Sequence, residues 1–129
     1  MRKIVLMCLL TMMSNSAMAG WVECAGDKDS SINCDSTTIR IDGNRVKMWV
    51  LNDYKKVIAP SYGKPYLSTI SQMEFDCKEE QIRGLYFSNY SGNMGSGELI
   101  YSDTDSTKWV PVVPRSTGEY VWKFACGIK

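Results

Sequence analysis

GKPYLSTISQMEFDCKEE, residues 63–80, is the stretch that decides the fold, because it contains a long candidate β-strand that ends in a cysteine, Cys77. Its residues alternate in character, which is typical of a strand with one buried face. We expect one face to point into the core, formed by Leu67, Thr69, Ser71, Met73, Phe75 and Cys77. We expect the other face to be polar and solvated, formed by Tyr66, Ser68, Ile70, Gln72, Glu74 and Asp76. Such a strand belongs in an antiparallel sheet with one wet side.

Residues 1–19 are predicted to be a secretory signal peptide. Arg2 and Lys3 precede an apolar run over residues 4–13, and a small-x-small cleavage site ends at Ala19. The run is too short to span a bilayer. We therefore expect cleavage between Ala19 and Gly20, with no transmembrane segment afterwards. Residues 20–129 are then expected to form one domain.

Cys8 lies inside that apolar run, without the small residues that a lipoprotein signal places before its cysteine. We therefore expect Cys8 to be removed with the signal peptide and the chain not to be lipid-anchored. Removal of Arg2 and Lys3 leaves 13 of the 15 basic residues against 14 acidic residues, a net charge of −1. This near-neutral balance favours neither nucleic acid nor an anionic membrane as a partner.

Four cysteines remain after the signal peptide, and an even number in a small exported domain predicts a disulfide framework. Their spacing does not resemble paired zinc ligands, and the chain has no histidine, so we expect no metal and no other cofactor. Three pairings are open. We favour Cys24 with Cys34, because a hairpin through residues 25–30 brings them close, which leaves Cys77 with Cys126. The loops closed would be about 11 and about 50 residues, worth roughly 3 and 4 kcal/mol.

The remaining elements form a series of strands with one helix at the end. Two prolines are expected to keep residues 109–114 extended without regular pairing. Ser116 and Glu119 match a capping box, so a helix is expected over 120–126, ended by Gly127. Other strands are expected at 21–24, 31–35, 45–54, 82–91 and 98–102, with a polar turn or short helical turn at 36–40. The fold class predicted is α+β: a small antiparallel β-sheet of about six strands with a short C-terminal helix packed on it, stapled by disulfides.

No arrangement of residues points to catalysis. Without histidine, a serine–histidine or cysteine–histidine pair cannot form. Glu74 and Asp76 share a strand face and could form a carboxylate pair for acid–base chemistry, but a solvated strand face explains them better. The glycine-rich residues 92–97 lack the ending of a phosphate-binding loop and precede a strand, so we interpret them as a hairpin turn. The sequence thus predicts a protein that is not an enzyme.

Aromatic side chains provide the candidate binding residues. Tyr62 and Tyr66 flank the loop that contains Lys64, and Trp49 lies on the less regular face of its strand, among charged residues. Exposed aromatics of this kind are common anchors of protein interfaces. We predict that Trp49, Tyr62, Lys64 and Tyr66 form a protein-binding patch. Packing at the rim of the core is the competing interpretation.

Several segments occur in an order that resembles a known family. They are WVLNDY at 49–54, GKPYLS at 63–68, EFDCK at 74–78, YSGNMGSG at 90–97, and a C-terminal stretch over 109–126. Together they resemble the surface-adhesin protein E-like family of Gram-negative bacteria, over nearly the whole chain from Trp21 to Gly127. The resemblance implies a small antiparallel sheet, a C-terminal helix packed on it, and a strand-to-helix disulfide.

The founding member of that family is an outer-membrane lipoprotein that binds host matrix and serum proteins such as vitronectin and laminin. This chain differs in lacking a lipobox, in carrying the additional Cys24 and Cys34, and in having no lysine- or arginine-rich stretch. The resemblance implies an exported, non-enzymatic binding protein of the bacterial envelope, in the periplasm or at the cell surface.

The partner implied is a protein, either a host extracellular-matrix protein or an envelope protein. An edge strand could also pair two copies into a homodimer. The alternative prediction is a soluble periplasmic inhibitor or assembly factor that acts on an envelope protein, because small disulfide-stapled β domains commonly do such work.

Overall fold

The computed structural model describes residues 20–129, and the predicted signal peptide, residues 1–19, lies outside them. The described chain folds into one antiparallel sheet with a C-terminal helix. The elements are β1 (Trp21–Gly26), β2 (Ser30–Asp42), β3 (Arg45–Ile58), β4 (Tyr66–Asp76), β5 (Gln81–Tyr90), the short 3-10 helix η3 (Asn93–Gly95), β6 (Leu99–Asp103), β7 (Val110–Pro111) and α1 (Thr117–Cys126).

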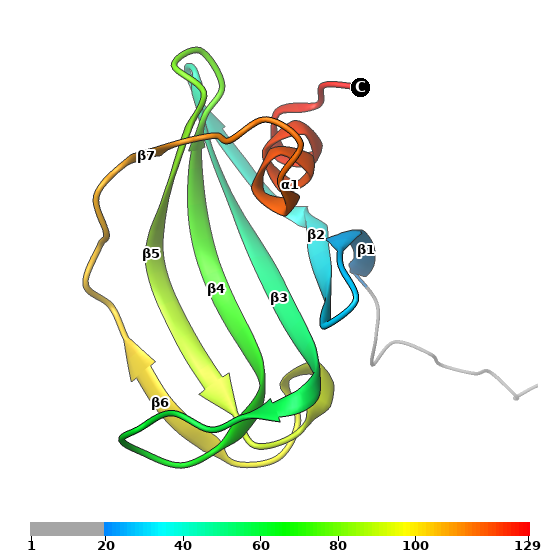
Figure 1. Ribbon diagram of the computed structural model, residues 1–129. Helices are drawn as coiled ribbons and strands as arrows, with labels where there is room; N and C mark the ends of the chain where they lie inside the picture. Colours follow the sequence, from blue (N-terminus) through cyan, green and yellow to red (C-terminus); the bar gives the residue numbers. More distant parts are fainter. Residues whose placement is uncertain (1–19) are drawn as a thin grey trace, which may run out of the picture.

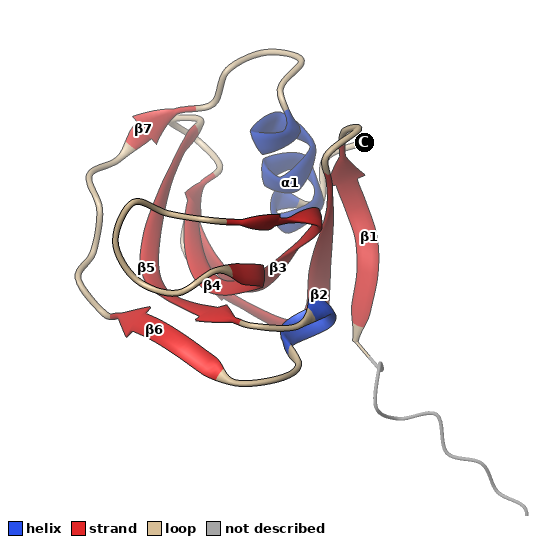
Figure 2. Cartoon of the chain, turned by 60° about the horizontal axis from the view of Figure 1, so that its bottom comes forward, coloured by secondary structure: helices blue, strands red, loops and turns tan. Residues whose placement is uncertain are grey.

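Strands β1 to β6 follow one another across the sheet in chain order, each antiparallel to its neighbour. Both β6 and β7 pair with β5, β6 at its end and β7 at its start. The sheet curls, and α1 lies against one end of its hollow side (Figures 1 and 2). This confirms the predicted α+β fold, with β7 as a seventh strand.

The core lies between α1 and the face of the sheet that we call the inner face, on which Val46, Met48 and Val50 alternate along β3. Phe75 on β4 is fully buried beside them. From the helix, Val121, Trp122 and Ala125 fill the other side of the core. The indole Nε1 of Trp122 donates a hydrogen bond of 3.0 Å to the carbonyl oxygen of Asp76, so the helix is fixed to the end of β4.

The predicted capping box begins the helix. The Ser116 hydroxyl accepts a hydrogen bond from the backbone N–H of Glu119, and the Glu119 carboxylate accepts one from the N–H of Arg115. Gly127 ends the helix in the left-handed region, with φ of 70°. These local signals place Cys126 next to the end of β4.

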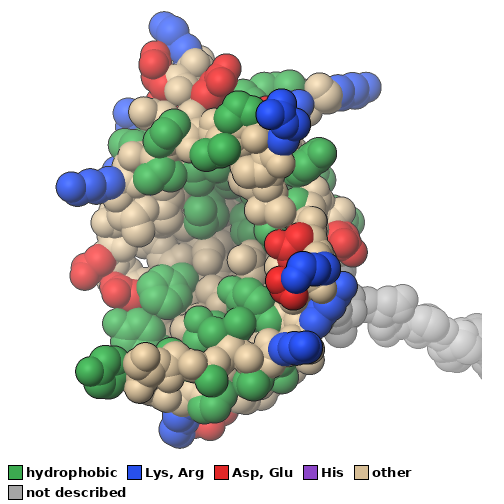
Figure 3. Space-filling model, viewed as in Figure 1, with side chains coloured by type: hydrophobic (Ala, Val, Ile, Leu, Met, Phe, Trp, Pro, Cys, Tyr) green, Lys and Arg blue, Asp and Glu red, His purple; other side chains and the backbone are tan. Residues whose placement is uncertain are grey.

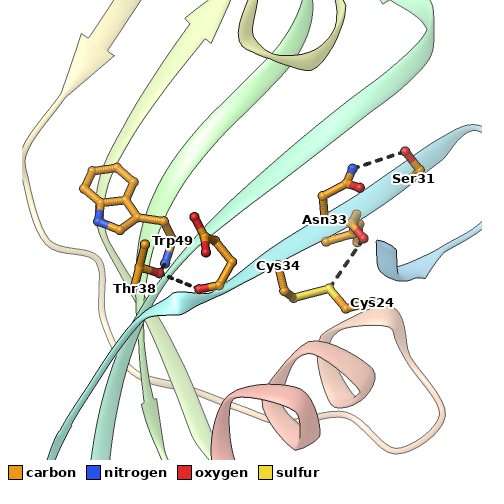
Figure 4. Close-up of a disulfide and its surroundings, with 8 residues drawn as sticks. Cys24, Ser31, Asn33, Cys34, Thr38 and Trp49 are labelled. Atoms are coloured by element: carbon orange, nitrogen blue, oxygen red, sulfur yellow. Dashed lines mark hydrogen bonds between the residues drawn. A yellow bond between two sulfur atoms is a disulfide. The ribbon is translucent and has the colours of Figure 1, made fainter. Parts of the chain in front are cut away.

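Two disulfides join the four cysteines of the described chain in the pairing favoured from the sequence. Cys77 is bonded to Cys126 at the helix, and Cys24 to Cys34 across β1 and β2 (Figure 4). The side chain of Cys34 is fully buried in the core. Both ends of the chain are therefore tied covalently to the sheet.

The strand expected to end at Cys77 ends one residue earlier. Strand β4 ends at Asp76, and Cys77 begins the turn that follows it. The Asp76 carboxylate causes this early end, because it accepts hydrogen bonds from the backbone N–H groups of Lys78 and Glu79. Residues 36–40 are not a helical turn but an irregular part of β2, where the pairing with β3 shifts.

The face expected to be solvated, which we call the outer face, is buried at Ser68, Glu74 and Asp76. Two later segments cover it. At one end, the Arg83 guanidinium bonds Glu74 with an Nη2–Oε1 distance of 2.7 Å, and the Trp109 ring lies 4.7 Å from that guanidinium. The prediction of a wet face was wrong because Arg83 on the neighbouring strand pairs with Glu74, and Trp109, which lies far along the chain, covers the pair.

At the other end, the glycine-rich connection covers the outer face. The Ser68 hydroxyl donates to the carbonyl of Gly92 at 2.6 Å and accepts from the N–H of Gly95 at 2.9 Å. The Asp53 carboxylate accepts from the backbone N–H of Met94 at 2.7 Å. A Cβ on Gly95 would lie 2.8 Å from the Ile70 side chain. Gly95 also has φ of 73°, a left-handed conformation that favours glycine, and residues 92–97 form a structural plug.

Candidate functional site

A groove lies on the inner face of the described chain, beside α1. The helix has 10 residues and is about 15 Å long, whereas β4 has 11 residues and extends about 36 Å. The helix therefore cannot cover the strand, and the part of the inner face near the β3–β4 loop stays open. The space-filling view shows this face hollowed, with hydrophobic side chains gathered in it (Figure 3).

Three adjoining cavities make up the groove, and shared lining residues join each to the next. The lower cavity has a volume of about 570 Å³, the middle one about 580 Å³ and the upper one about 270 Å³. Tyr66, Phe87 and Asn89 line both the lower and the middle cavity. Ser71 and Met73 line both the middle and the upper cavity. The groove thus continues from the β3–β4 loop to the start of α1.

The lower section contains three of the four residues predicted to bind protein. Tyr62, Lys64 and Tyr66 line it together with Ile100 and Tyr101. Tyr62 is 91% exposed, the largest value among the exposed large hydrophobic residues of the described chain. The Lys64 ammonium is paired with Glu98 at 3.2 Å. This section is an apolar, aromatic hollow with one charged pair at its rim.

The middle section has a polar floor. The Thr69 hydroxyl donates to the side-chain oxygen of Asn89 at 2.8 Å and accepts a longer hydrogen bond of 3.4 Å from the Tyr54 hydroxyl. The rings of Tyr54 and Tyr66 meet edge to face, with centroids 6.0 Å apart. Burial raises the pKa of the Tyr66 phenol above its ordinary value, and the neighbouring Tyr54 adds to the rise. Tyr66 therefore stays a neutral hydrogen-bonding group well above neutral pH.

The fourth predicted binding residue, Trp49, lies elsewhere. Val50 faces α1, so its neighbour Trp49 points to the outer face by strand alternation. Its ring packs edge-on against Tyr86, with centroids 5.5 Å apart. Figure 4 shows the Trp49 ring pointing away from the helix. It lies beside Thr38, whose hydroxyl accepts a hydrogen bond from the backbone N–H of Trp49. The structure brings Tyr62, Lys64 and Tyr66 together and separates Trp49 from them.

The carboxylates weighed for acid–base chemistry are occupied by structural contacts. Glu74 is paired with Arg83, and Asp76 organises the turn after β4 and lies 3.9 Å from Arg45. Within residues 20–129, no group of three or more metal-ligating side chains comes together. In the same part of the chain, every helix is too short or too polar to cross a bilayer.

Several groove residues were not singled out from the sequence. Phe87 and Asn89 come from β5, and Asp103 and Asp105 lie at and beyond the end of β6. The alternation along β5 could have placed Phe87 and Asn89 on one face. No local pattern could have indicated the two aspartates, because they reach the groove only through the pairing of β6 with β5.

Comparison with known proteins agrees with this architecture. The family model for surface-adhesin protein E matches residues 21–127. A crystal structure of Haemophilus influenzae protein E is similar with a TM-score of 0.66 at 14% identity, covering 84% of this chain and 88% of that one. Protein E from non-typeable Haemophilus influenzae gives a TM-score of 0.62 at 14% identity, covering 88% of this chain and 80% of that one.

No curated protein sequence matches the chain significantly. The structural likenesses, at such low identity, show the shared fold alone. The family model is the stronger finding, because it spans nearly all of the described residues and all of the elements from β1 to α1. On that ground, the chain belongs to the surface-adhesin protein E family.

Proposed function

We propose that this chain is an exported, non-enzymatic binding protein of the bacterial envelope that recognises another protein through the groove. One observation carries the proposal: an open groove lined by tyrosines lies on the inner face of a rigid, disulfide-tied sheet. Tyrosine combines a large apolar area with a hydroxyl, which is why it is enriched at the centres of protein interfaces. Membership of an adhesin family supports a protein as the ligand.

A binding function also fits the chemistry of the groove. Its lining consists mainly of tyrosines, apolar side chains, hydroxyls and an amide, with Lys64, Asp103 and Asp105 as its charged residues, and it contains no histidine. The tyrosines, hydroxyls and amide hold a ligand through packing and hydrogen bonds, and no histidine stands beside a hydroxyl to activate it as a nucleophile. Host matrix and serum proteins are the partners proposed, by analogy with the family.

Export is proposed from the predicted signal peptide and from the disulfides, which persist in oxidising compartments. Cell fractionation tests the final location. An adhesin should be accessible to protease on intact cells. Detection only in osmotic-shock fluid would contradict the adhesin proposal and favour a soluble periplasmic inhibitor or assembly factor.

Binding of the oxidised chain to immobilised vitronectin and laminin tests the groove itself. Tyr62→Ala combined with Tyr66→Ala should weaken binding about five- to thirtyfold, the cost of losing interface anchors. The matched control is Tyr120→Ala, because Tyr120 is an exposed tyrosine on α1 that does not line the groove. Unchanged binding by the double variant would refute the proposal, and loss on Trp49→Ala alone would move the site to the outer face.

A further inference from the structure

The middle section of the groove carries negative charge without a matching cation. Asp103 and Asp105 line it, and none of its lining residues in the described chain is a lysine or arginine. Neither aspartate takes part in any of the four salt bridges found within residues 20–129. Lys64 lines the lower section, at the far side of Tyr66, and is already paired with Glu98. Lys108 follows this segment but does not line the groove.

The two aspartates have different local roles. One Asp103 oxygen accepts from the backbone N–H of Asp105 at 2.8 Å, and the other accepts from the Tyr101 hydroxyl at 3.4 Å. Asp103 is therefore held by its own segment. The Asp105 side chain is exposed, and its carboxylate has no hydrogen-bond partner among residues 20–129. Asp105 is thus available to a ligand.

Aromatic side chains line the same section as this charge. They include Tyr54, Tyr66 and Phe87. The faces of aromatic rings attract ammonium and guanidinium groups, and the apolar stems of lysine and arginine pack on them. A carboxylate beside such rings favours a ligand with one positive charge on a long apolar stem.

The ends of the groove differ from its middle. The upper section is lined mainly by core side chains such as Val50, Met73 and Val121, and the lower section by Tyr62 and Ile100. Because the three sections adjoin, a ligand that fills them must be longer than one side chain. An extended peptide, at about 3.3 Å per residue, can place successive side chains along such a groove.

We infer that the groove binds an extended segment of a partner protein in which a lysine or arginine lies between apolar side chains, the cation meeting Asp105 and the aromatic walls of the middle section. This inference rests on the proposed function and adds to it the chemical class of the segment recognised. The apolar side chains enter the upper and lower sections. The hydroxyls and amide of the polar floor, Thr69, Ser71 and Asn89, bond the backbone of the segment.

Fluorescence polarisation with labelled nonapeptides tests the inference. The probes share flanking leucine and tyrosine residues and carry lysine, arginine, glutamine or glutamate at the centre. The lysine and arginine peptides should bind about two- to fivefold more tightly than the glutamine peptide, as for an exposed ion pair, and more tightly still than the glutamate peptide. The difference should shrink at high salt.

Variants of the chain locate the charge that matters. Asp105→Asn should remove most of the preference for lysine over glutamine, and Asp105→Lys should reverse it in favour of glutamate. Asp42→Asn is the matched control, because Asp42 is an exposed aspartate at the β2–β3 hairpin that does not line the groove. Asp103→Asn is a second variant within the groove, and circular dichroism checks that the segment held by Asp103 keeps its structure.

Equal binding of lysine and glutamate peptides would overturn the inference, as would a preference that Asp105→Lys leaves unchanged. Absence of peptide binding at millimolar concentration would overturn it too. None of these results decides the proposed function. That proposal is tested by whether the double variant of Tyr62 and Tyr66 binds whole proteins more weakly.

Discussion

The disulfide between Cys77 and Cys126 should supply a large part of the stability of the fold. It closes a loop of about 50 residues, and the chain-entropy model assigns such a loop about 4 kcal/mol at 25 °C. A domain of this size has a net stability of about 5–15 kcal/mol. We therefore expect the double substitution Cys77→Ala and Cys126→Ala to lower the free energy of unfolding by about 4 kcal/mol. Both side chains are only partly buried, so alanine adds little packing loss.

Urea unfolding followed by tryptophan fluorescence measures this loss. If the bond acts on the unfolded chain, its removal should also raise the urea m-value, because the free chain exposes more surface. The native helix should stay docked through Trp122 and its hydrogen bond to Asp76, which near-ultraviolet circular dichroism reports. A loss below about 1 kcal/mol with an unchanged m-value would refute the reasoning. A changed native spectrum would instead show that the bond holds the helix in place.

Two further predictions concern the plug and the groove. Asp53→Ala should lower the free energy of unfolding by about 1–3 kcal/mol, because the backbone N–H of Met94 loses its acceptor in a partly buried site. Urea unfolding measures this loss. Amide hydrogen exchange should accelerate at the plug but not in α1. Tyr66 stabilises the fold fully below the ordinary tyrosine pKa of 10.0, and this contribution is lost as the pH rises through its raised pKa. In the Tyr66→Phe variant, the melting temperature should therefore fall less steeply at alkaline pH. The variant should also lose tyrosinate absorbance that appears above the ordinary tyrosine pKa, and an unchanged absorbance titration would contradict the raised pKa of Tyr66.

Local signals predicted the parts of the fold that depend on neighbouring residues. Ser116 and Glu119 placed the helix, Gly127 ended it, and the turn-rich residues between Cys24 and Cys34 indicated one disulfide and, by elimination, favoured the other. Apart from the second disulfide, which followed by elimination, each of these features involves residues within about one turn or one hairpin of each other. They were predictable because their physical causes are contained in short stretches of sequence.

Other features that depend on distant segments were not predicted. Polar Ser68 and Glu74 were expected to face water because residues that cover them are remote in sequence: the plug for Ser68, and Trp109 over the Arg83–Glu74 pair for Glu74. The residues that line the proposed binding groove show the same division. Tyr62, Lys64 and Tyr66 were singled out because they are neighbours in sequence. The middle and upper sections of the groove, built from β4, β5 and the segment after β6, were missed.

Hydrogen bonding distinguishes the structural polar groups of this fold from those available to a ligand. On the outer face, three carboxylates have partners, including the two weighed for catalysis: Asp53 bonds the plug, Glu74 bonds Arg83, and Asp76 bonds its own turn. A buried polar group without a partner would cost stability, so these bonds are needed for folding.

Along the groove the situation is reversed. Within residues 20–129, the amide nitrogen of Asn89, the hydroxyl of Tyr66 and the carboxylate of Asp105 have no hydrogen-bond partner, yet all three line one continuous hollow. Water satisfies such groups in the free protein, and a ligand can replace that water without breaking any bond within the protein. Substitutions on the outer face should therefore change stability, whereas substitution of Asp105, whose carboxylate makes no bond within this part of the chain, should change binding and leave stability nearly unaltered.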